Sequence, residues 1–130
     1  MENAAPPKTL LVVDDDDSVR DFTVRILKSL NYNVLSAADG HAALALFRNH
    51  SAHIALIMTD MVMPNMTGKD FVEAVRGIDP RMKVLFVSGY GPDDALGHLA
   101  NDPGIAFLQK PYIRKQLSET LAGLLADPES

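Results

Sequence analysis

Short apolar runs alternate with segments of helical periodicity along most of this chain. The runs are four to six residues long and show little polar alternation. This pattern is typical of strands that are covered on both faces, as in a parallel sheet. We predict strands over Thr9–Val13, Asn33–Ser36, Ile54–Thr59, Lys83–Ser88 and Ile105–Leu108.

The segments between these runs carry apolar residues three or four positions apart, which is the spacing of one helix face. The stripes consist of Val19, Phe22, Ile26, Leu27 and Leu30; Leu44 and Phe47; Phe71, Val75 and Ile78; and Leu117, Leu121 and Leu124. A further helix over Pro92–Ala100 should be the weakest, because it contains Gly97 and few large apolar anchors. The pattern predicts an α/β fold in which five helices flank a doubly wound, five-stranded parallel sheet.

Composition narrows the class of protein. The 130 residues suit one domain, which we place at residues 9–126 between polar tails at 1–8 and 127–130. The chain has no cysteine, which excludes a disulfide scaffold and a zinc-thiolate site. Its net charge of −5 argues against direct nucleic-acid binding, and no apolar run is long enough for membrane insertion. We therefore expect a cytoplasmic domain.

Reactive side chains follow the predicted strands. Asp14 and Asp15 follow the first, Asp60 the third, Ser88 the fourth and Lys110 the fifth. In doubly wound sheets such groups collect at the carboxyl ends of the strands. Carboxylates held close together repel one another unless a cation neutralises them, and oxygen ligands favour Mg²⁺, Mn²⁺ or Ca²⁺. A carboxylate beside such a metal, an ammonium and a hydroxyl is equipped to accept a phosphoryl group.

Some of the polar residues have a structural interpretation. Aspartates before a helix often cap it and complement its dipole, and we interpret Asp16 and Asp17 in this way. Thr67 and Asp70 have the spacing of a capping box at a helix start. The histidines lack metal-ligand spacing relative to the acids, and we expect them at the surface: His41, His50, His53 and His98.

Four motifs in order resemble the receiver domain of two-component response regulators. They are Asp14-Asp15 after an apolar strand, the segment Asp60–Gly68, Ser88-Gly89, and Phe107-Leu108-Gln109-Lys110-Pro111. The resemblance covers roughly Thr9 to Ala126. It implies the flavodoxin-like receiver fold with strand order 2-1-3-4-5.

The resemblance assigns the phosphorylation chemistry to a few residues. Asp60 would be the phosphoacceptor, which takes a phosphoryl group from a phosphohistidine. Asp14 and Asp15 would hold Mg²⁺, or Mn²⁺ in its place, Asp15 directly and Asp14 through water. Asp60 and the backbone carbonyl of Val62 would complete the protein's share of the coordination.

The same resemblance assigns the switch and the lifetime of the phosphorylated state. Ser88 and Lys110 would bind phosphoryl oxygens, and the bond from Lys110 to Pro111 would be cis. Phe107 stands where an aromatic residue turns inward on activation. Val62 and Tyr90 occupy positions that help to place the hydrolytic water, and here they are apolar and aromatic.

These roles imply a signalling module that catalyses its own phosphorylation and dephosphorylation and acts on no separate substrate. Its partner would be a sensor histidine kinase or a histidine phosphotransfer domain. The readout surface would comprise Pro92–Ala100, the fifth strand and the last helix, through which a phosphorylation-dependent dimer could form. The chain could be a free regulator or a receiver of a hybrid sensor histidine kinase. The amino-acid sequences of its last two motifs slightly favour the hybrid kinase.

A small phosphatase resembling haloacid dehalogenases is the alternative enzyme. It also uses a strand-end aspartate with Mg²⁺ and a second aspartate two residues later, a spacing that Asp14 to Asp17 provide. The Ser18-Val19 that follows differs from the Gly-Thr typical of that family. That reading also leaves the segment Met63–Gly68 unexplained.

Overall fold

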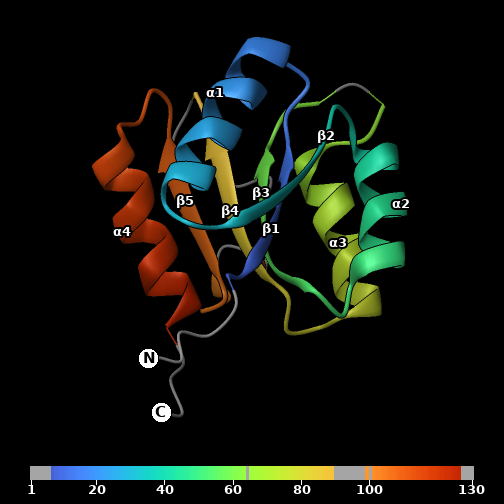
Figure 1. Ribbon diagram of the computed structural model, residues 1–130. Coiled ribbons are helices and arrows are strands. Elements are labelled where there is room, and N and C mark those ends of the chain that lie inside the picture. Colours follow the sequence, from blue (N-terminus) through green and yellow to red (C-terminus); the bar gives the residue numbers. More distant parts are fainter. Residues whose placement is uncertain (1–6, 64, 90–98, 100, 127–130) are drawn as a thin grey trace.

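Five parallel strands form the centre of the molecule in the order β2-β1-β3-β4-β5 (Figure 1). This computed structural model describes residues 7–63, 65–89, 99 and 101–126. The strands are β1 (Thr9–Val13), β2 (Asn33–Ala37), β3 (Ile54–Asp60), β4 (Lys83–Ser88) and β5 (Ile105–Gln109). The predicted strand order and the doubly wound fold are confirmed.

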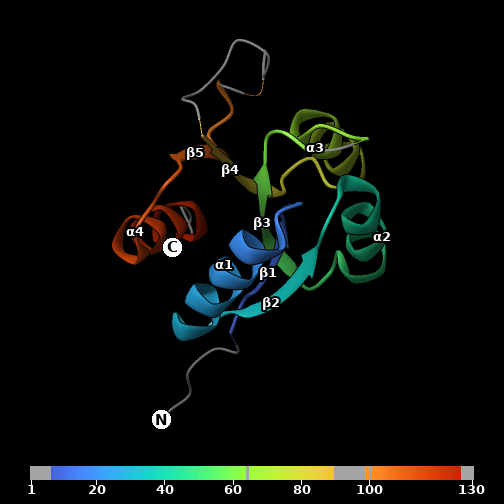
Figure 2. The ribbon, with the colours of Figure 1, turned by 90° about the horizontal axis from the view of Figure 1, so that it is seen from above.

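Four described helices cover the two faces of the sheet. They are α1 (Asp17–Ser29), α2 (Gly40–His50), α3 (Gly68–Ile78) and α4 (Arg114–Leu125). Seen from above, α1 and α4 lie on one face and α2 and α3 on the other (Figure 2). The helix predicted over Pro92–Ala100 falls outside the described residues, apart from Leu99, and so do the predicted tails except for Pro7 and Lys8. Within the described part of the chain, no helix has the length and apolarity needed to cross a membrane.

Each central strand contributes to two separate cores. In β1, Leu10 and Val12 pack with α1 and α4, whereas Leu11 and Val13 pack with α2 and α3. Successive side chains of a strand point to opposite faces, so a strand covered by helices on both faces needs an unbroken apolar run. This explains why the strands could be predicted from the sequence.

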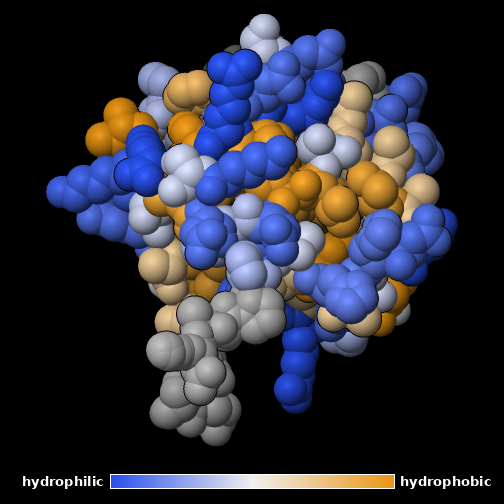
Figure 3. Space-filling model, viewed as in Figure 1, coloured by the Kyte–Doolittle hydropathy of each residue, from blue (hydrophilic) through white to orange (hydrophobic). Residues whose placement is uncertain are grey.

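Two residues of the predicted helix stripes are exposed. Phe22 is 55% exposed and Ile78 is 46% exposed, while Thr23 is buried next to Phe22. Membership of an apolar stripe therefore does not place these two side chains in the core. On the face drawn in Figure 3, apolar side chains (orange) likewise appear between hydrophilic ones (blue).

Candidate functional site

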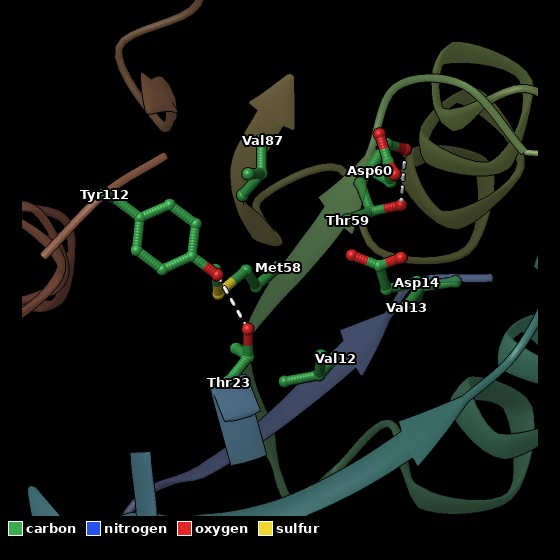
Figure 4. A pocket seen from close by; sticks show the side chains of 9 residues that line it. All are labelled: Val12, Val13, Asp14, Thr23, Met58, Thr59, Asp60, Val87 and Tyr112. Atoms are coloured by element: carbon green, nitrogen blue, oxygen red, sulfur yellow. Dashed lines mark hydrogen bonds between the residues drawn. The ribbon is translucent and has the colours of Figure 1, made fainter. Parts of the chain in front are cut away.

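Three carboxylates meet at the carboxyl ends of β1 and β3. These strands are neighbours, with Val13 beside Thr59, so Asp14 and Asp60 come to lie next to each other (Figure 4). One carboxylate oxygen from each of Asp14, Asp15 and Asp60 lies within 4.8 Å of the other two. The structure thus brings together the three acids that the sequence singled out.

Asp14 is the most buried of the three acids, with 6% of its surface exposed. Its Oδ1 accepts a hydrogen bond from the Asp16 amide at 2.9 Å, and Arg20 Nη1 donates to its backbone carbonyl at 2.8 Å. Burial raises the pKa of Asp14, against the opposing effects of the Asp16 amide and Lys110. A charged carboxylate is therefore costly here in the absence of a cation.

Lys110 places its ammonium between two of these carboxylates. Its Nζ lies 3.1 Å from Asp60 Oδ2 and 3.4 Å from Asp14 Oδ2. Burial alone would lower the pKa of Lys110, but the hydrogen bond and charge of Asp60, together with Asp14, outweigh it and raise the pKa. The backbone amide of Lys110 donates to the Ser88 carbonyl at 2.7 Å, and the bond from Lys110 to Pro111 is cis. Lys110 is thus a fixed positive charge at the acidic cluster.

The loop after Asp60 folds back tightly against its own start. The Val62 amide donates to Asp60 Oδ1 at 3.3 Å, and the Gly68 amide donates to the Met61 carbonyl at 2.9 Å. A Cβ on Gly68 would come within 2.3 Å of the Asp60 carbonyl oxygen, so only glycine fits here. Thr67 caps α3 by accepting from the Asp70 amide at 3.1 Å, which confirms the predicted cap.

The donor set of this cluster fits a hard divalent cation. All of the candidate ligand atoms are oxygens, and the acids bring more negative charge than Lys110 alone can neutralise. Oxygen ligands of this kind suit Mg²⁺ and Mn²⁺, whereas zinc and copper favour nitrogen and sulfur ligands. Asp14, Asp15 and Asp60 are the residues that could hold such an ion.

The remaining predicted residues occupy different settings. Ser88 ends β4 and is buried, whereas the Val62 side chain is 71% exposed. Phe107 on β5 is half-buried and stacks on Phe86, with ring centroids 5.5 Å apart. Tyr90 lies outside the described residues.

Asp16, Asp17 and the described histidines lie where the sequence predicted them. Asp16 caps α1 by accepting from the Val19 amide at 3.1 Å, and Asp17 lies in the first turn, where it pairs with Arg20. Both interpretations are confirmed. His41, His50 and His53 are exposed as predicted, and His98 is outside the described residues.

Sequence reasoning missed a buried hydrogen bond below the acids. Thr23 Oγ1 and Tyr112 Oη lie 2.7 Å apart, although 89 residues separate them in the chain (Figure 4). Both residues belong to the wall of the small cavity that Asp14 and Asp60 also line. No local spacing could have indicated this contact, because it joins α1 to the segment that follows β5.

Comparison with known proteins agrees with this geometry. The family model described as the response regulator receiver domain matches residues 10–122. The response regulator receiver protein CpdR of Brucella abortus is 31% identical over 91% of this chain and 97% of its own length. The sensor kinase CckA of the same organism is 38% identical over 90% of this chain, which spans only 12% of that kinase.

Solved structures show the same likeness. The receiver domain of the hybrid histidine kinase CckA matches with a TM-score of 0.77 and 33% identity, over 91% of this chain and 99% of that one. The chemotaxis protein CheY4 of Vibrio cholerae matches with a TM-score of 0.83 and 30% identity, over 92% and 99% respectively. Both comparisons cover nearly the whole chain.

Proposed function

Because this chain belongs to the response regulator receiver domain family of two-component signalling, we propose that it accepts a phosphoryl group on Asp60 from a phosphohistidine. The observation that carries the proposal is the position of Lys110, whose ammonium contacts both Asp60 and Asp14. Asp60 also ends β3 in front of the tight loop to Gly68. Its carboxylate thus lies at the acidic rim, which is the carboxyl end of the sheet where Asp14, Asp15 and Asp60 meet. A nucleophilic carboxylate held by an ammonium beside a metal-ligand set is suited to phosphoryl transfer.

In the proposed reaction an Asp60 oxygen forms a bond to phosphorus while the phosphorus–nitrogen bond of the donor histidine breaks. The imidazole leaves with the electron pair of that bond, and its nitrogen takes up a proton from water. Lys110 pairs with one phosphoryl oxygen, and the Ser88 hydroxyl donates to another. Asp15, Asp60 and the Val62 carbonyl would hold Mg²⁺ directly, and Asp14 would hold it through water. The ion, when bound, neutralises charge on the phosphoryl oxygens.

The modified Asp60 then draws Ser88 and Lys110 inward in the proposed switch. Phe107 follows by filling the space that Ser88 vacates, and its stacking on Phe86 of β4 supports this route. The altered surface comprises residues 92–100, β5 and α4. This surface would carry the phosphorylation-dependent dimer or another output contact.

The lifetime of the phosphorylated state depends on the water that attacks it. Val62 is exposed and offers that water no hydrogen-bonding side chain, which supports slow hydrolysis. The double substitution Val62→Asn and Tyr90→Glu should speed the loss of the phosphoryl label from Asp60 about ten- to hundredfold, since one positioned water contact is worth about 1–3 kcal/mol. Label decay in buffer measures this effect. Rapid decay in the unmodified protein would contradict a governing role for these two positions.

The phosphodonor in this proposal is a histidine kinase or a phosphotransfer protein in the cytoplasm. An apolar groove lined by Val19, Phe22 and Pro111 adjoins Lys110, and the exposed Phe22 supports a protein contact beside the rim. Phe22→Ala should then slow labelling by a phosphohistidine protein and leave labelling by acetyl phosphate unchanged. Equal slowing with both donors would contradict docking at this groove.

The receiver extends over residues 9–126 in this proposal, either as a free regulator or as part of a hybrid kinase.

Intact mass spectrometry after incubation with acetyl phosphate and Mg²⁺ tests the function directly. We expect a single phosphoryl increment that requires Mg²⁺ and disappears in Asp60→Asn. Asp17→Asn, which changes an exposed aspartate of α1 in the same way, is the matched control and should keep the increment. An unchanged increment in Asp60→Asn, or continuous turnover of p-nitrophenyl phosphate, would overturn the proposal.

A further inference from the structure

A buried hydroxyl pair links α1 to the segment that carries Lys110. Thr23 is 2% exposed and Tyr112 is 9% exposed, and their oxygens share a hydrogen bond of 2.7 Å. Tyr112 comes two residues after Lys110, with Pro111 between them. The bond therefore attaches this short segment to a helix on the same face of the sheet.

The pair lies directly below the acidic rim. One cavity of about 10 Å³ has Thr23 and Tyr112 on its wall together with Asp14, Thr59 and Asp60. Figure 4 shows the two hydroxyls meeting on one side of this cavity and the two carboxylates on the other. Burial raises the pKa of the Tyr112 phenol, while the Thr23 bond and the charge of Lys110 act in the opposite direction. The phenol is therefore uncharged at neutral pH and close enough to interact electrostatically with Lys110.

The segment from Lys110 to Tyr112 is held at both of its ends. At the first end, the Lys110 amide donates to the Ser88 carbonyl at 2.7 Å. At the second end, the Tyr112 hydroxyl shares a hydrogen bond with Thr23. Pro111, which lies between Lys110 and Tyr112, has a fixed φ angle and no N–H group. The Lys110 side chain leaves this clamped segment and reaches Asp60 at 3.1 Å.

Packing alone does not account for the two hydroxyls. The Tyr112 ring belongs to the core formed with Leu117 and Leu121, and phenylalanine would fill the same space. Valine has nearly the shape of threonine at position 23. Two buried hydroxyls must satisfy each other to offset their desolvation, so their net contribution to folding is small. What the hydrogen bond adds is a defined position of Tyr112 relative to α1.

We propose that the Thr23–Tyr112 hydrogen bond positions the Lys110 ammonium for phosphoryl transfer to Asp60. Thr23 and Tyr112 are positioning residues in this inference, which rests on the proposed function of Asp60. Without the bond, the segment after Lys110 gains freedom, and the ammonium spends less time between Asp60 and Asp14. Transfer then slows, although the acidic cluster is intact.

The test measures the rate constant of Asp60 labelling by acetyl phosphate at saturating Mg²⁺. Tyr112→Phe and Thr23→Val should each slow labelling about three- to tenfold, the effect of about one hydrogen bond. The double variant should be no slower than either single variant, because both remove the same bond. Thr23→Ser, which restores a hydroxyl, should regain most of the rate. Tyr32→Phe makes the same chemical change at a half-buried tyrosine that packs against the same core and should leave the rate unchanged.

A second cycle distinguishes positioning from general destabilisation. In a Lys110→Ala background, Tyr112→Phe should slow labelling by no more than about twofold, because the group that it positions is gone. Full slowing in that background, or parent rates in both Tyr112→Phe and Thr23→Val, would overturn the inference. If Tyr112→Phe fails to fold, the comparison of Thr23→Val with Thr23→Ser carries the same test. A failure of the proposed function is different, because the parent protein itself would then not be labelled at Asp60.

Discussion

Four consecutive aspartates in this chain lie in different surroundings, because each stands at a different point between the end of β1 and the first turn of α1. Asp14 directly follows β1 and is buried, and Asp15 is exposed but still joins the cluster of carboxylates. Asp16 caps α1, and Asp17 pairs with Arg20 one turn further on. The chemical type is the same in each case, so differences in burial and hydrogen bonding set their roles.

The contrast between Asp15 and Asp17 leads to a prediction about metal affinity. Asp15→Ala should weaken Mg²⁺ binding about tenfold or more, since it removes an anionic oxygen from the candidate ligand set. Asp17→Ala should change the affinity less than about twofold, because its carboxylate faces solvent and pairs with Arg20. Isothermal titration calorimetry measures both affinities. Equal losses would mean that the acidic run attracts the ion only as a diffuse charge.

Asp14 carries a prediction about stability and pH. Burial raises its pKa above the ordinary value of 3.8, so the metal-free fold favours the neutral carboxyl. The stability from this group is complete below its unfolded pKa and is lost as the pH rises through the raised folded pKa. Asp14→Asn, which stays uncharged, should therefore raise the free energy of unfolding near neutral pH, and this gain should shrink as the pH falls toward about 4.

Urea denaturation with a chelator present measures this free energy of unfolding at both pH values. Asp17→Asn is the control, since its exposed carboxylate has no burial cost to relieve. Lower stability of Asp14→Asn at neutral pH would show that the contacts of Asp14 with Lys110 and the Asp16 amide outweigh its burial. Asp14→Asn should also bind Mg²⁺ more weakly, which would make the acid a residue kept for function at a cost in stability.

Helix α3 and the loop before it show how one element places the chemistry. The loop returns from Asp60 so closely that Gly68, the first residue of α3, lies against the backbone of Asp60 and Met61. Buried Phe71, Val72 and Val75 then hold the helix on the sheet. The position of Asp60 is therefore tied to the packing of α3.

Two glycines of α3 give a matched pair of substitutions. Gly68→Ala should lower the free energy of unfolding by about 1–3 kcal/mol, because the new Cβ meets backbone atoms that cannot move aside. Gly77→Ala, with open space around its Cβ, should instead raise it by about 0.5–1 kcal/mol. Thermal and urea denaturation measure both effects. A stable Gly68→Ala protein would show that the loop can retreat from Asp60.

At the scale of the whole molecule, the acidic rim is connected to the β5 edge of the sheet. Phe107 on the edge strand β5 stacks on Phe86, and β4 ends at Ser88 near the rim. The β5 residues are half-buried or exposed, whereas those of β4 after Lys83 are buried. A change at the rim can therefore reach a region where repacking costs less than in the centre of the sheet.

We expect phosphorylation of Asp60 to change amide exchange in β5 and α4 as well as near Asp60. The physical reason is that the modified carboxylate favours one of two arrangements of the rim and its neighbours. Helix α2, which lies across the sheet from α4, should keep its exchange rates and serves as the internal control. Changes confined to the surroundings of Asp60 would contradict a switch that reaches the β5 edge.

Local pattern was sufficient for the strands, for the caps of α1 and α3 and for the choice of Asp14, Asp60 and Lys110. Strands covered on both faces need unbroken apolar runs, and caps depend on residues within one turn. In a doubly wound sheet, functional groups follow the carboxyl ends of strands. These features depend on neighbouring residues in the chain, so they could be predicted from the sequence. The family resemblance then ordered the strands and assigned a role to each residue.

Contacts between distant segments were decided only in the folded molecule. Spacing placed Phe22 in the core stripe of α1, yet Phe22 is exposed and Thr23 is buried. The reason is that Thr23 meets Tyr112, a partner 89 residues away that helical periodicity cannot reveal. Likewise, the two distances from Lys110 to Asp60 and Asp14 depend on how β5 lies beside β4. Periodicity reports which face of a helix can be apolar, but only tertiary packing selects the residues that meet a partner there.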